Sequence, residues 1–172
     1  METKKSFNNI VLIFATLYAI LGILSMLITP QTTNPKDPVM TAISFIFLFL
    51  FIGLTVLAVW YYKKQGFPVT LGKAVKLGVL VGLLGGLLVG LYAVIYFVYI
   101  NPDAIEQVLA LSRQVLEDND MFDADMIDKQ MEITRKFFIL GQFAGQIFSG
   151  LLYGVIGGLL GGLFFKTPSE DY

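Results

Sequence analysis

The sequence contains no cysteine and no histidine among its 172 residues. The absence of cysteine excludes disulfide bonds, thiol nucleophiles and the usual ligands of iron–sulfur clusters, and it leaves the redox compartment unreadable. The absence of histidine removes imidazole bases and, with cysteine also missing, the usual ligand sets for zinc, haem and copper. We therefore expect no catalytic residue, no metal site and no cofactor, and an enzyme ranks last among the function classes.

Charged residues are scarce in four long apolar runs, at about residues 7–29, 39–62, 74–100 and 137–165, whose one charge is Lys76 near the start of the third. The chain is 56% apolar with a mean hydropathy of +0.73, which is too apolar for a soluble globule. Runs of about 20 apolar residues are long enough to cross a bilayer as helices. The sequence therefore predicts an all-α, polytopic membrane fold with four transmembrane helices, and the lack of ionisable residues at membrane depth argues against coupled transport.

The first apolar run has an alternative interpretation as a secretory signal peptide, because Lys4 and Lys5 precede it. Its apolar core exceeds the roughly 7–15 residues of a signal peptide, and no small-residue cleavage site follows before Pro30. We interpret this run as the first transmembrane helix of a single membrane domain over residues 1–172.

Glycine recurs at every fourth residue in the third and fourth runs. Glycine inside a helix costs roughly 0.5–1 kcal/mol relative to alanine, but in lipid the helix persists, and small residues four apart let another helix approach closely. We predict glycine-zipper packing between these two helices, antiparallel and with a right-handed crossing, and a seam between two copies of the chain is the alternative. The residues are Gly78, Gly82, Gly86 and Gly90 in the third run and Gly150, Gly154, Gly158 and Gly162 in the fourth.

Three helix starts carry capping signals. Asp37 followed by Pro38 is a predicted N-cap with proline at the first helical position, and Thr70 is the predicted cap of the third helix. Asn101 followed by Pro102 has the same pattern and predicts a further helix after the third run.

Residues 101–136 form the one sizeable polar segment, with nine acidic residues against four basic ones and a net charge of −5. Apolar residues on one face predict an amphipathic helix to about Glu117, and a second helix resumes near Asp125 and continues into the fourth run. Nothing else in the chain is an evident mate for the apolar face, so we expect it to dock a partner or to lie along the outer bilayer surface. The face consists of Ile105, Val108, Leu109, Val115 and Leu116.

An acidic stretch from Asp118 to Asp128 begins like a calcium loop. It departs from that pattern because Phe122 occupies the fifth position and Asp123 the glycine position. We interpret it as a solvated acidic face, with weak calcium or magnesium binding as the open alternative.

A polar stripe runs along the fourth helix near its outer end. Gln142, Gln146, Ser149 and Tyr153 are spaced four, three and four apart, so they share one face. Hydrogen bonding between helices is the preferred interpretation, and a small cavity is the alternative.

The distribution of lysine and arginine predicts the orientation. Four spans place both termini on one side, and the N-terminus, the second connection and the tail together hold seven basic residues against five in the other two loops. Lys63, Lys64, Lys73 and Lys76 concentrate four of the seven beside two span ends. We predict that both termini lie in the cytoplasm and that the acidic segment lies outside.

The stretch from Gly66 onward through the third run resembles the family catalogued as domain of unknown function 4199, small bacterial membrane proteins with four spans. The shared pattern is a turn glycine, an alanine and a lysine at the start of the third span, and asparagine, proline and an acid at its end. The resemblance implies a four-span fold in the bacterial inner membrane and assigns no chemistry. The matching residues are Gly66, Leu71, Gly72, Ala74, Lys76, Gly78, Asn101, Pro102 and Asp103.

The leading functional hypothesis is a non-enzymatic interaction, scaffold or accessory protein. Its predicted partners are the lipid bilayer and a membrane protein or a second copy of the chain, and we expect no nucleic acid. The alternative is a carrier or pore for a small neutral or lipidic solute, which would use Gln142, Gln146 and the tyrosines.

Overall fold

The computed structural model describes residues 6–29, 37–118 and 122–167, and all regular secondary structure in these ranges is helical. Lys4, Lys5 and Lys36, on which part of the predicted orientation depends, lie outside the described residues, as does Asp120 of the acidic stretch. The helices are α1 (Phe7–Ile28), α2 (Pro38–Lys64), α3 (Leu71–Ile95), the π-helical turn η1 (Tyr96–Ile100), α4 (Asp103–Glu117) and α5 (Ala124–Phe165).

Four helical segments are long and apolar enough to cross a membrane: α1, α2, α3 with η1, and α5. The predicted all-α class and the four spans are therefore confirmed, and the chain is a multi-pass membrane protein. The fourth predicted span is the later part of a much longer helix, because α5 begins at Ala124 and continues without a break to Phe165.

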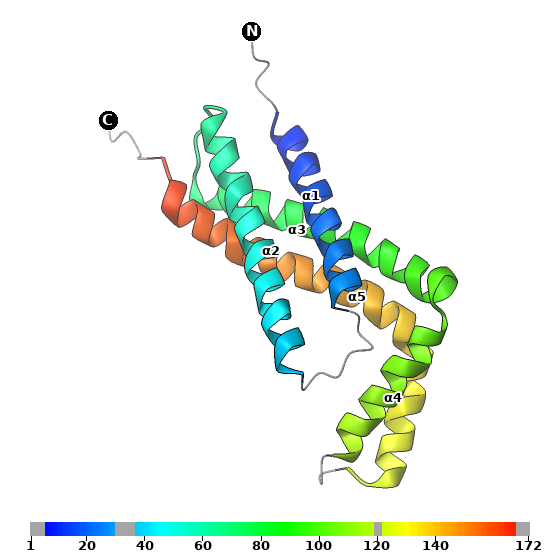
Figure 1. Ribbon diagram of the computed structural model, residues 1–172. Coiled ribbons are helices and arrows are strands. Elements are labelled where there is room, and N and C mark those ends of the chain that lie inside the picture. The colour runs from blue at the N-terminus through cyan, green and yellow to red at the C-terminus, as the bar shows by residue number, and fades with distance from the viewer. Residues whose placement is uncertain (1–5, 30–36, 119–121, 168–172) are drawn as a thin grey trace.

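The four long helices are arranged around α3 and α5, which lie side by side (Figure 1). Helix α1 packs against α3, whereas α2 packs mainly against α5 and also contacts α1 and α3. Helix α4 folds back along the first turns of α5, at the opposite end of the molecule from the α2–α3 connection (Figure 1). The molecule therefore has a helical bundle and, at one end of it, a helical hairpin.

Two of the three predicted caps are confirmed. The Asp37 carboxylate accepts a hydrogen bond from the Val39 amide at 2.9 Å, and the Thr70 hydroxyl accepts one from the Lys73 amide at 3.3 Å.

The predicted cap at Asn101 is wrong. Helix α4 begins one residue later than predicted, at Asp103, and has no side-chain cap. The cause is η1, whose wide turn is closed by a hydrogen bond from the Asn101 amide to the Tyr96 carbonyl at 2.8 Å. The Asn101 side chain turns back with it and donates to the Tyr96 hydroxyl at 3.2 Å.

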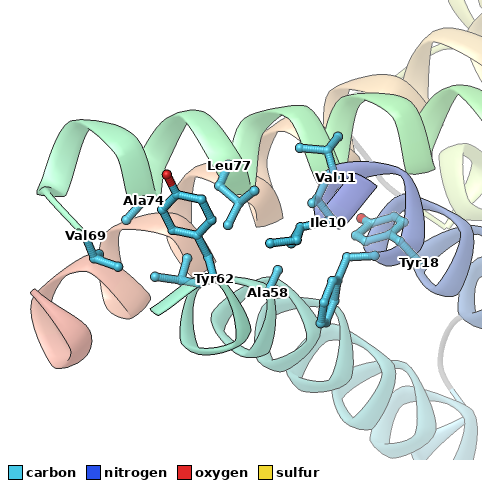
Figure 2. Close-up of a cluster of buried hydrophobic side chains, with 11 residues drawn as sticks. Ile10, Val11, Tyr18, Ala58, Tyr62, Val69, Ala74 and Leu77 are labelled. Atoms are coloured by element: carbon cyan, nitrogen blue, oxygen red, sulfur yellow. The ribbon is translucent and has the colours of Figure 1, made fainter. Parts of the chain in front are cut away.

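The main core lies where α1, α2 and α3 converge near the α2–α3 connection (Figure 2). Ile10 of α1, Ala58 of α2 and Leu77 of α3 are completely buried there. The ring of Tyr62 stacks on Phe67 with centroids 4.9 Å apart. This cluster fixes the beginning of α1 beside the end of α2.

The end of α5 is tied to the same place by two hydrogen bonds. The Val69 amide donates to the Thr167 hydroxyl at 3.0 Å, and the Thr167 amide donates to the Val69 carbonyl at 2.9 Å. Gly66 allows the preceding turn, because its φ of 83° is unfavourable for other residues. The beginning of α1, the α2–α3 connection and the end of α5 thus form one end of the molecule, which we name the basic end for its lysines.

The expectation that the apolar face of α4 has no mate within the chain is wrong. Leu109 is only 4% exposed, and it joins Ala104, Phe97 and Phe138 in a second buried cluster, although Val115 stays 45% exposed. The mate is the beginning of α5, which starts 13 residues before its uncharged run and turns Ile127 and Met131 inward. We name α4 and residues 124–136 of α5 the charged hairpin.

Candidate functional site

The contact between α3 and α5 is made by the two backbones. A Cβ atom added to Gly78 would overlap the carbonyl oxygen of Gly154, and one added to Gly154 would overlap that of Gly78. Gly82 and Gly150 show the same reciprocal relation one turn further along. The two helices are therefore antiparallel, and no space for a side chain exists between them.

The remaining predicted packing glycines extend this seam in both directions. A Cβ on Gly86 would lie 2.5 Å from the carbonyl oxygen of Gln146, and one on Gly90 would lie 3.0 Å from the Phe143 ring. Toward the basic end, Gly158 faces the α3 backbone at Ala74, and Gly162 faces the side chains of Leu71 and Ala74. The structure thus places all eight glycines between two helices of one chain, so these faces are not free to form a seam between copies.

Three glycines of the seam are preceded by a second glycine that faces a different helix. Successive residues point about 100° apart around a helix, so a glycine pair offers a flat surface to two neighbours at once. The second glycine of each pair faces the seam, and the first faces α1 or α2. The pairs are Gly85–Gly86, Gly157–Gly158 and Gly161–Gly162, and their first members meet Tyr18, Thr55 and Val59 respectively.

These additional contacts were not predicted, although the paired glycines are visible in the sequence. A Cβ on Gly85 would lie 2.7 Å from Cγ of Tyr18, and one on Gly161 would lie 2.8 Å from Cβ of Val59. In the opposite direction, Gly22 of α1 faces α3, and its missing side chain leaves space for the side chain of Val89. The two helices of the seam, α3 and α5, therefore also pack closely against α1 and α2.

Thr55 is a buried polar side chain in the middle of this packing. Its hydroxyl donates to the Ile52 carbonyl at 2.7 Å and lies 3.5 Å from the Tyr153 carbonyl of α5. Burying a hydroxyl costs little once it is hydrogen-bonded. The Thr55 hydroxyl therefore has its hydrogen-bond partners in the backbone, and the side chain packs between α2 and α5.

The four residues of the predicted polar stripe are all half-buried on α5. The Tyr153 ring stacks on Phe51 of α2, with centroids 5.8 Å apart and planes 16° from parallel. The Gln146 carbonyl lies against Gly86, and Gln142 and Ser149 continue the stripe toward the charged hairpin. The two grooves described below are lined by other residues.

Ion pairs connect the two arms of the charged hairpin. The Arg113 guanidinium contacts Glu117 of α4 at 2.7 Å and Asp128 of α5 at 2.8 Å, and Arg135 of α5 contacts Glu106 of α4. The hydrogen bonds that Arg113 donates to Glu117 and Asp128 raise its pKa further, and an arginine side chain is charged at any physiological pH.

An open groove of about 440 Å³ lies between the arms of the hairpin. Leu109, Ala110 and Met131 contribute its apolar part, and Glu132 lies among the charged residues at its rim. The rim carries both signs of charge, so it has no clear preference for an anion or a cation.

The acidic stretch from Asp118 to Asp128 contains residues that have other structural roles. Asp123 caps α5 by accepting a hydrogen bond from the Met126 amide at 2.8 Å, and Asp128 is paired with Arg113. Residues 119–121 lie outside the described part of the chain, and in the remainder no group of three or more candidate ligands is gathered around one point.

A second groove, of about 380 Å³, lies between α1 and α2. Leu17, Leu21 and Leu24 line it from α1, and Leu50 and Leu57 line it from α2. The groove is apolar and opens outward from the bundle, since Leu17, Leu24 and Leu57 are each about half exposed.

Comparison with known proteins gives one match. The family model described as "Protein of unknown function (DUF4199)" matches residues 12–167. No curated protein and no solved structure matches the chain. The family match covers α2, α3, α5, the charged hairpin and α1 from residue 12 onward, and it confirms the resemblance seen in the third span. The chain therefore belongs to the DUF4199 family.

Proposed function

We propose that this protein is a non-enzymatic interaction protein of the bacterial inner membrane, a scaffold or accessory subunit that presents the charged hairpin to a membrane-protein partner. The bundle anchors the chain, and the hairpin stands outside the bilayer. The proposal rests on the hairpin as a folded element with charged outer surfaces.

The length of α5 supports this arrangement. Its 42 residues extend over about 63 Å at 1.5 Å per residue, whereas the hydrocarbon core of a bilayer is about 30 Å thick. The first 13 residues, 124–136, carry six of the hairpin's charged groups and account for about 20 Å of that length. Burial of these charges in lipid would be costly, so this part of α5 stands outside the membrane.

The outer surface of the hairpin indicates the charge of the partner. Its ion pairs use Glu106, Glu117 and Asp128. In the described chain, the acids Asp103, Asp125 and Glu132 are exposed outside these ion pairs, as are the bases Lys129 and Lys136, so the acids are in excess. A complementary partner would present basic groups to this surface, since opposite potentials steer association and select partners.

The lysines of the basic end support an orientation with both termini in the cytoplasm. A thiol-labelling experiment tests it, because the natural chain has no cysteine and every introduced thiol is unique. In intact cells, a membrane-impermeant maleimide is expected to label Asp125→Cys and to leave Lys63→Cys unlabelled until the cells are permeabilised. The reverse pattern would show that the hairpin faces the cytoplasm.

Photocrosslinking in native membranes tests the interaction role. A photoreactive amino acid at Asp125 or Val115 on the hairpin is expected to give a discrete protein adduct that is lost when Asp103 and Glu132 are changed to lysine. The same amino acid at Leu163, which is 70% exposed on the bundle, is the matched control and should react with lipid. Lipid adducts alone from both hairpin positions would refute the partner and favour a hairpin that lies on the bilayer surface.

A carrier for a lipidic solute is the second candidate function, favoured by the apolar groove between α1 and α2. The α3–α5 seam offers no alternative route, because its backbones are in contact. Reconstituted protein that accelerated the transbilayer movement of a fluorescent lipid, and lost that activity with Gly53→Leu in the groove, would establish this function in place of the first.

A further inference from the structure

We propose that α1 and α2 hold one bilayer lipid with an anionic headgroup, whose phosphate lies at Lys64 and whose acyl chain occupies the groove between the two helices. The inference does not depend on the proposed function, since the site lies on the bundle at the basic end and the charged hairpin takes no part in it.

The first argument is a continuous stripe on α2. Leu50, Gly53 and Leu57 line the groove, and Trp60 and Lys64 follow them at helical spacings of three and four, which keeps all five on one face. The Lys64 ammonium lies 5.1 Å from the centroid of the Trp60 ring. An apolar groove thus leads directly to an aromatic ring and a positive charge.

The stripe has the length of one leaflet. From Leu50 to Lys64 the helix rises about 21 Å, and half of a bilayer with its headgroup region is about 20–22 Å thick. Tryptophan favours the level between headgroups and acyl chains. When Trp60 is placed at that level, Lys64 reaches the phosphates and the groove lies among the acyl chains.

Charge complementarity selects the headgroup. Five lysines lie at the basic end, and among the described residues there no aspartate or glutamate accompanies them. Lysines near a membrane surface each favour anionic lipids, and the absence of local acids leaves the charge at Lys64 available to a phosphate. The five are Lys63, Lys64, Lys73, Lys76 and Lys166.

The shape and lining of the groove suit an acyl chain. From Leu17 to Leu24 the groove follows seven residues of α1, about 10 Å of helix. It offers about 380 Å³, is lined by apolar side chains and opens outward from the bundle. Gly53 keeps it open, because a Cβ added there would meet no atom within 4 Å.

Trp60 is the single tryptophan of the chain and reports on the site directly. The full chain is reconstituted in phosphatidylcholine bilayers that contain a fraction of lipid brominated near the top of its acyl chains. The brominated lipid is either phosphatidylglycerol or phosphatidylcholine, and the quenching of Trp60 fluorescence is measured against its mole fraction. Half-quenching is expected at an about fivefold lower fraction of the anionic lipid, the size of effect that one lysine at a membrane surface exerts.

Two variants separate the two parts of the site. Lys64→Gln is expected to remove the preference for the anionic lipid, and Gly53→Leu is expected to reduce quenching by both lipids because its side chain fills the groove. The matched controls are Lys129→Gln on the charged hairpin and Gly145→Leu, a glycine of α5 that is also open to its surroundings. Both controls should behave like the natural protein.

Equal quenching of the natural protein by the two lipids would overturn the proposal. A preference for the anionic lipid that persists in Lys64→Gln would also overturn it. Lys64 is exposed, so the substitution is compatible with the fold. Loss of the preference on addition of excess inorganic phosphate would also overturn it, because the site would then bind free phosphate and no lipid headgroup. If Gly53→Leu fails to assemble, the Lys64→Gln comparison still decides.

Discussion

Helix α5 packs against a neighbour in both of its parts, and it does so by opposite means. In its later part it meets α3 through glycines that bring the two backbones into contact. In its first part it meets α4 through large side chains, Met131 among them, and through ion pairs at the edges. One continuous helix therefore packs through its backbone at one end and through large side chains at the other.

The difference follows from the two solvents that we assign to these parts. Lipid chains are as apolar as leucine, so transmembrane helices gain little by burying apolar side chains and associate instead through close van der Waals contact. In water, removing Leu109 from solvent is itself favourable, and an approximate fit is enough. The seam should therefore tolerate no added atom, whereas the hairpin should tolerate changes that preserve apolar volume.

The largest effect is expected for Gly82→Ile in the seam. The side chain would have to displace the backbone of Gly150, so the free energy of unfolding in detergent should fall by about 3 kcal/mol. Thermal denaturation followed by circular dichroism measures the change. Gly145→Ile is the matched control, because no atom lies within 4 Å of the position of its Cβ. Equal stability of the two variants would place the helix contact elsewhere.

The next largest effect is expected for Leu109→Ala in the hairpin. The loss of a buried leucine side chain costs about 2–3 kcal/mol, and we expect the loss to remain local because α4 packs mainly on α5 and η1. Hydrogen exchange should become faster in α4 and in residues 124–136 and remain unchanged in α3. Leu109→Met is the control that retains apolar volume. Faster exchange throughout the bundle would show that the two contacts form one cooperative unit.

The α3–α5 contact could be predicted from the sequence because it leaves a periodic trace. Glycines four residues apart in two uncharged runs indicate both the helices and the faces that meet. The positions of α1 and α2 could not be predicted in this way, because they depend on which side chain enters each gap. Tyr18 and Val59 have no distinctive spacing in the sequence. The one sign of a second neighbouring helix is that Gly85 and Gly161 each precede another glycine.

The charged hairpin was predicted less well for a different reason. The apolar positions of residues 101–136 lie in two helices that an acidic stretch separates, so no single period along the sequence links them. Met131, Phe138 and Ile139 of α5 belong to the apolar cluster that contains Leu109. The groove between α1 and α2 had no signal at all, since Gly53 is one glycine among 17 and its openness depends on how two helices sit side by side.

A smaller effect is expected where a glycine faces a side chain that can be shortened. Gly22→Ala places its Cβ against Val89, 3.1 Å from Cγ1 and closer to Cγ2, and should destabilise the protein by about 1–2 kcal/mol. In a Val89→Ala background both Cγ atoms are absent, so the added cost of Gly22→Ala should disappear. A double-mutant cycle of thermal stabilities measures this coupling. Additive effects of the two substitutions would show that α1 and α3 are not in contact at this point.

The smallest effect is expected for Arg113→Gln in the hairpin. Arg113 and its partners Glu117 and Asp128 are all about half exposed, and exposed ion pairs contribute little because water and salt screen them. Protection of α4 amides should fall by about twofold or less at low salt, and the difference should vanish at high ionic strength, with Lys129→Gln as the control. Of the two Arg113 ion pairs, only the one with Asp128 joins the two arms, and the Glu106–Arg135 pair between the arms remains in the variant. A loss of protection as large as that of Leu109→Ala would mean that charge holds the hairpin closed, and salt would then open the surface that we propose as the docking site.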